Sequence, residues 1–77
     1  MTYQELKMIM RSKARLANGL VNLLKDDTEQ MCIDVDDLDV YSLGEAIREA
    51  KRTSQNLIDT INDLERDLRM LKRDGVK

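Results

Sequence analysis

Residues 43–71 read LGEAIREAKRTSQNLIDTINDLERDLRML, and the spacing of apolar residues in this stretch decides the fold class. Steps of three and four residues give nine positions, of which eight are apolar. These positions are Leu43, Ile47, Ala50, Ser54, Leu57, Ile61, Leu64, Leu68 and Leu71. Four heptads of this pattern predict a long helix with one apolar stripe. Ser42 and Glu45 have capping-box spacing, so we expect the helix to span about residues 42–73, with Gly75 as a stop signal.

A second amphipathic pattern precedes this helix. Thr2 and Glu5 also have capping-box spacing, and apolar residues then recur on one broad face from Leu6 to Leu24. The pattern predicts a helix over about residues 3–25, whose opposite face carries basic and amide side chains.

The segment between the two patterns, residues 26–41, contains seven acidic residues and no basic residue. We expect it to be an acidic connector. Its form stays open: the alternation of apolar and polar residues over 31–35 favours a short extended stretch, whereas the pair of aspartates at 36 and 39 suits an early start of the second helix. A connector of this length is unusual in a small domain, which points to contacts of its own.

Two amphipathic helices joined in this way predict an all-α antiparallel helical hairpin in which residues 1–77 form a single domain. Placing Leu24 opposite Leu43 also brings Lys13 opposite Ser54, and these two are the only polar residues of the facing stripes. Two interpretations of Lys13 stay open: its ammonium group extends to the solvent at the edge of the hairpin, or it forms with Ser54 a polar layer that sets the register or the oligomeric state.

In this register the last turns of the second helix have no partner in the first. We therefore expect the chain to self-associate, as a coiled coil or helical bundle, most simply a homodimer. Isoleucine recurs at position a of the heptads of the second helix, and leucine recurs at position d. This combination favours a parallel pair of helices, in which Asp67 faces Lys72 of the second chain. The residues expected to carry this self-association are Ile61, Leu64, Leu68 and Leu71.

The residue inventory argues against an enzyme. The chain has no histidine, one cysteine and three isolated glycines, so it offers no histidine-based catalysis, no internal disulfide and no phosphate-binding loop. An EF-hand beginning at Asp34 fails because Leu38 and Asp39 stand where an oxygen ligand and a glycine are needed. We expect no catalytic residue, no cofactor and no metal site.

The net charge of −2 hides a strong segregation of charge, because residues 1–25 carry +4 and residues 26–41 carry −7. The acidic connector is a candidate surface for a protein partner, through Asp34, Asp36, Asp37 and Asp39. The basic face of the first helix is a candidate surface for phosphate groups, through Lys7, Arg11 and Arg15.

No apolar run approaches the length of a membrane span, and the N-terminus lacks the apolar segment of a signal peptide. We expect a cytoplasmic protein that does not bind membranes. The favoured function is a small non-enzymatic protein that acts through protein–protein interaction, as an inhibitor, adaptor or assembly factor of the kind common in phages and mobile elements. The alternative is a small nucleic-acid-binding regulator that uses the basic face of the first helix.

Overall fold

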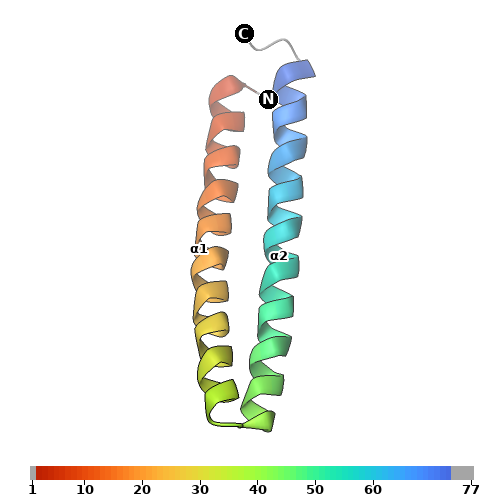
Figure 1. Cartoon of the computed structure of the whole chain (residues 1–77). Helices are drawn as coiled ribbons and strands as arrows, with labels where there is room; N and C mark the ends of the chain where they lie inside the picture. The colour runs from red at the N-terminus through yellow and green to blue at the C-terminus, as the bar shows by residue number, and fades with distance from the viewer. Residues whose placement is uncertain (1, 74–77) are drawn as a thin grey trace.

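The computed structural model describes residues 2–73, which form two helices lying side by side and antiparallel (Figure 1). Helix α1 spans Tyr3–Asp36 and helix α2 spans Val40–Arg73. The molecule measures 55 × 15 × 15 Å. We call the end with the turn the closed end, and the end where α1 begins and α2 finishes the open end. The predicted all-α helical hairpin is confirmed; the stop expected at Gly75 lies outside the described residues.

The predicted connector is wrong, because residues 26–36 continue α1 and only three residues separate the helices. The cause lies in Asp27 and Asp34, which face α2 at positions where the amphipathic pattern calls for apolar residues. Each carboxylate accepts a hydrogen bond from a hydroxyl of α2: Asp27 from Thr53 at 3.5 Å and Asp34 from Ser42 at 2.9 Å. The apolar period therefore ends in the sequence well before the helix does.

Both helices begin with a side-chain cap. The Glu5 backbone amide donates to Thr2 Oγ1 at 3.2 Å, as the sequence predicts. In α2 the cap is Asp39 rather than Ser42: the Ser42 amide donates to Asp39 Oδ1 at 3.1 Å. Of the two alternatives for residues 26–41, an early start of the second helix near Asp39 therefore agrees better with the structure than an extended stretch over 31–35.

The register of the hairpin differs from the predicted one by 13 residues of α2, from position 54 to position 67, which is about three and a half helical turns. Lys13 Nζ lies 2.7 Å from Asp67 Oδ2, so the partner of Lys13 is not Ser54. A turn of three residues, in place of a long connector, forces each residue of α1 to face a later residue of α2 than expected. As a result Leu71 shares a hollow with Tyr3, and the last turns of α2 do lie beside α1.

Two rows of side chains form the seam between the helices, and each row recurs every seven residues along each helix. The mixed row consists of Leu6, Lys13, Leu20, Asp27, Asp34, Ala46, Thr53, Thr60 and Asp67. The apolar row consists of Met10, Ala17, Leu24, Met31, Leu43, Ala50, Leu57, Leu64 and Leu71. Seven members of the mixed row are buried, whereas in the apolar row only Ala50 is. The row with the larger apolar side chains is thus the less buried one.

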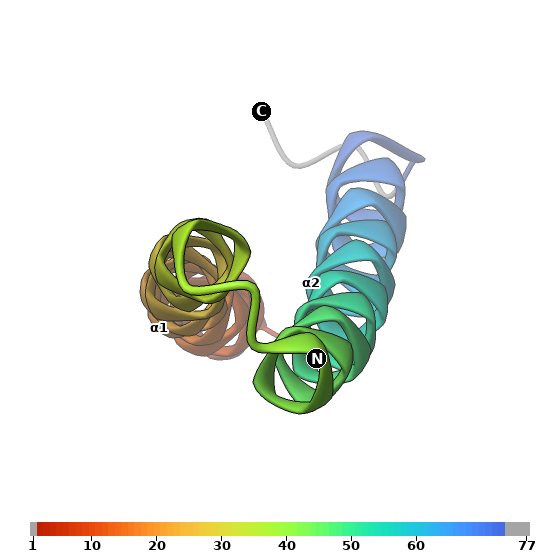
Figure 2. The same ribbon diagram turned by 60° about the horizontal axis from the view of Figure 1, so that its bottom comes forward.

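Figure 2, in which the closed end comes forward, shows the two helices as a single layer. Among the described residues no third element covers either side of the seam. The apolar row therefore remains accessible along the length of the hairpin.

Candidate interaction surface

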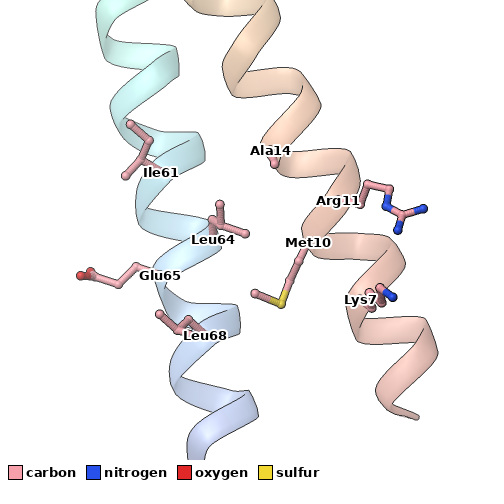
Figure 3. A pocket seen from close by; sticks show the side chains of 8 residues that line it. All are labelled: Lys7, Met10, Arg11, Ala14, Ile61, Leu64, Glu65 and Leu68. Atoms are coloured by element: carbon pink, nitrogen blue, oxygen red, sulfur yellow. The ribbon is translucent and has the colours of Figure 1, made fainter.

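The apolar row borders a hollow at the open end of the hairpin (Figure 3). Met10 extends from α1 into the space between the helices, toward Leu64 and Leu68 of α2, while the charged ends of Arg11 and Glu65 point away from it. The hollow therefore has an apolar floor and charged rims. Its lining residues are Lys7, Met10, Arg11, Ala14, Ile61, Leu64, Glu65 and Leu68.

Two further hollows continue this surface toward the closed end. One lies between the helices and is lined by Leu24, Thr28, Met31, Ile47, Ala50, Lys51, Ser54, Gln55 and Ile58. The other follows α1 and is lined by Thr28, Met31, Cys32, Val35 and Asp36. We call the surface formed by these three hollows the groove face. It runs along the hairpin, is apolar at both ends, and includes no member of the mixed row.

The residues predicted to mediate self-association fall on or beside the groove face. Ile61 and Leu68 line it with 51% and 41% of their surface exposed, and Leu64 and Leu71 are half-buried members of the apolar row. The expectation that Leu68 and Leu71 lack neighbours in α1 is wrong, because Leu68 shares a hollow with Met10. Self-association itself stays a prediction.

Two polar pairs of the mixed row meet across the seam, Lys13 with Asp67 and Asp27 with Thr53, whereas the Thr60 hydroxyl donates to the Asn56 carbonyl of its own helix. The Lys13–Asp67 pair is largely shielded, with side-chain exposures of 29% and 11%. Asp34, the most buried of the row at 3%, accepts hydrogen bonds from Gln30 Nε2 and from Ser42 Oγ, both at 2.9 Å. Within residues 2–73 every buried side-chain nitrogen and oxygen has a hydrogen-bond partner.

This pairing removes one basis for the predicted parallel association. Asp67 is held by Lys13 inside the hairpin, so it does not border an outer seam where Lys72 of a second chain could reach it. Lys13 does form a polar pair across the seam, but its partner is Asp67 and not Ser54.

The predicted acidic surface divides into residues with different roles. Asp34 is buried inside the hairpin, so it does not belong to an exposed partner-binding surface. Asp39 caps α2 while its residue stays exposed, and Asp36 and Asp37 are exposed at the closed end. The acidic residues at this end therefore both build the turn and charge its surface.

The closed end also carries an apolar tip that sequence reasoning missed. Leu38, Val40 and Tyr41 are 83%, 81% and 81% exposed. Leu38 adopts φ 53°, a left-handed conformation that glycine or asparagine adopts at lower cost. The signal in the sequence was the presence of apolar residues within an acidic run, where a solvated loop has no need of them.

The three basic residues predicted to contact phosphate are all exposed on α1 near the open end. Lys7 and Arg11 line the hollow of the groove face, but Arg15 does not. The structure therefore places two of the three at the rim of the groove face and the third elsewhere on the outside of α1.

The described residues bring no three potential metal ligands together. Neither helix combines the length and the apolar character that crossing a membrane needs. Comparison of the chain with known protein families, with curated proteins and with solved structures gives no match.

Proposed function

We propose that this chain is a small non-enzymatic protein that acts through protein–protein contacts and works as a homo-oligomer. The observation that carries the proposal is the burial of the seam. Seven of the nine members of the mixed row are buried, whereas eight of the nine members of the apolar row are half-buried and several of their apolar neighbours are exposed. Large contiguous apolar surface on a small protein marks a site where another protein binds.

The size of the hydrophobic core supports the same proposal. Only four apolar residues are buried in the described structure: Leu6, Leu20, Ala46 and Ala50. Among residues 2–73, sixteen large apolar residues are exposed, and five of them line the groove face beside the half-buried apolar row: Val35, Ile47, Ile58, Ile61 and Leu68. A chain below about 80 residues rarely gains more than about 3–5 kcal/mol from its own core even when that core is well packed. A further protein layer over the apolar row would supply the missing burial.

The non-enzymatic part of the proposal follows from what the groove face offers to a ligand. At the open end its floor is made of aliphatic and methionine side chains, and the charged ends of Arg11 and Glu65 point away from the hollow. Catalysis needs polar groups that converge on one reacting atom. An apolar channel open to solvent suits a helix of another chain far better than a small substrate.

The apolar tip is the favoured contact for a different protein. It combines Leu38, Val40 and Tyr41 with the exposed carboxylates of Asp36 and Asp37. A strained, exposed leucine at a position that suits glycine weakens the turn and is best explained by a contact outside the chain. An inhibitor, adaptor or assembly factor would then associate through the groove face and present the tip to its partner.

Charge introduced into the groove face tests the self-association. We expect Ile61→Asp to weaken the association of the chain at least 100-fold, because a carboxylate would be buried against apolar side chains. Sedimentation equilibrium at 1–100 micromolar, about the range in which small helical bundles assemble, measures the effect.

A matched control exists in the same chain. Ile33 is 52% exposed, almost the same as Ile61, but it lies outside the groove face. Ile33→Asp should leave the association unchanged. A wild-type chain that is a stable monomer, or an equal effect of both substitutions, would contradict the self-association part of the proposal.

The second candidate function is nucleic-acid binding by the basic residues of α1. The observation that favours it is the exposure of Lys7, Arg11 and Arg15 near one end of the molecule. In fluorescence anisotropy with a labelled duplex, we expect binding to weaken steeply with salt and to be lost in the triple variant Lys7→Glu, Arg11→Glu, Arg15→Glu. Binding that survives the triple reversal would remove this candidate.

A further inference from the structure

We propose that a second copy of this chain covers the groove face in an antiparallel orientation, so that the closed end of each copy lies over the open end of the other. This inference rests on the proposed self-association and specifies its partner, its surface and its orientation. The two-fold axis would run perpendicular to the helices, and the product would be a four-helix bundle in which α1 packs on α1 of the second copy and α2 on α2.

The dimensions of the groove face suit a second hairpin. One side of the molecule is 55 Å long and 15 Å wide. That corresponds to roughly 800 Å² per copy, which is the area that each partner contributes to a standard stable interface. A shorter ligand, such as a single peptide turn, would leave most of the apolar surface exposed.

The apolar side chains of the groove face do not by themselves select an orientation. The hollow at the open end presents Met10 and Leu64, and the hollow at the closed end, which follows α1, presents Met31 and Val35. Because both ends are apolar, a copy placed either way round would bury similar side chains. The orientation must therefore come from the charges.

The two halves of the hairpin carry opposite net charge. In the open half, residues 3–19 and 57–73 contain eight basic and five acidic residues, a net charge of +3. In the closed half, residues 20–56 contain four basic and nine acidic residues, a net charge of −5. Copies with their closed ends together would bring like charges together, whereas the antiparallel orientation places each acidic half beside a basic half.

Of the charged residues that line the groove face, those at its two ends that form no ion pair agree with this assignment. Glu65, at the open end, is already paired with Arg69 at 3.0 Å, and Lys51 lines the hollow between the two ends. Lys7 and Arg11 border the hollow at the open end, and Asp36 borders the hollow at the closed end. None of these three side chains forms an ion pair within the described hairpin. The antiparallel two-fold brings Lys7 and Arg11 of each copy to the end where Asp36 of the other lies, on both sides of the dimer at once.

The native cysteine provides a direct test. Cys32 is exposed, lines the groove face near the closed end and is the only cysteine in the chain. With a spin label on Cys32, the antiparallel dimer should give a label-to-label distance of about 35–40 Å by pulsed electron resonance, because each label lies about twelve residues from the centre of α1 at 1.5 Å per residue. A dimer with its closed ends together should give less than about 25 Å, since helices diagonal in a bundle lie about 14 Å apart.

A second label position separates the orientation from the association. In the variant Cys32→Ser, Asn18→Cys the label lies near the middle of α1, and either orientation should give a short distance. A short distance at position 18 with a long one at position 32 supports the proposal. Short distances at both positions would overturn the antiparallel orientation and leave the self-association intact. No dipolar signal at either position, together with a monomer in sedimentation, would overturn both.

Discussion

Leu20→Ala is expected to lower the free energy of unfolding by about 3 kcal/mol, which is a large part of the stability available to a hairpin of this size. Leu20 is 9% exposed and, with Leu6, one of only two leucines among the buried residues. Its truncation removes apolar contacts in the middle of the seam, where neither helix end can close the cavity. Thermal or urea unfolding followed by circular dichroism, at one fixed protein concentration, measures the change.

Leu16→Ala is the matched control for this substitution. Leu16 stands four residues earlier in α1, in the same apolar pattern of the sequence, but it is 56% exposed. Its replacement should change the free energy of unfolding by no more than about 0.5 kcal/mol. Equal effects of the two substitutions would mean that α1 does not present Leu20 to α2, and that the seam is assigned to the wrong residues.

The second large effect is expected at the Lys13–Asp67 pair. Asp67→Ala should lower the free energy of unfolding by about 2 kcal/mol, because it leaves the Lys13 ammonium without its partner in a largely shielded position. The loss should be smaller than for a fully buried pair, because the Lys13 side chain keeps 29% of its surface in water. The double variant Lys13→Leu, Asp67→Leu should be close to the wild type or more stable.

An exposed ion pair of the same helix serves as the control. Glu45→Ala breaks the contact of Arg48 Nη1 with Glu45 Oε1 at 2.9 Å, between side chains that are 67% and 49% exposed. The expected loss is about 0.2–0.5 kcal/mol. If Asp67→Ala cost no more than this, or if the double leucine variant were as unstable as Asp67→Ala, the pair would have no part in holding the two helices in register.

The fold gives the separation of basic and acidic residues a meaning that the sequence alone does not show. The sequence shows a basic segment followed by an acidic one, and either could bind a separate partner. The hairpin places four of the five basic residues of the first segment in the open half and all seven acidic residues of the second in the closed half, and a straight hairpin 55 Å long cannot bring its two halves together. Two antiparallel copies, in contrast, can place the acidic half of each beside the basic half of the other.

The sequence by itself determined the helical class, the cap of α1 at Thr2 and a long second helix, because these depend on local spacing and on neighbouring backbone groups. It also placed Ile61 and Leu68 among candidate contact residues, since an apolar stripe is visible in one helix alone. None of these features depends on which residues of the other helix lie opposite.

Only the tertiary structure decided the length of α1, the register and which stripe is buried. Asp27, Asp34 and Asp67 look like surface residues until the hydroxyl or ammonium groups that meet them are known. These donors lie 26, 8 and 54 residues away in the chain. A carboxylate is acceptable at an inward position only when a donor on the facing helix satisfies it, and no periodicity within one helix contains that information.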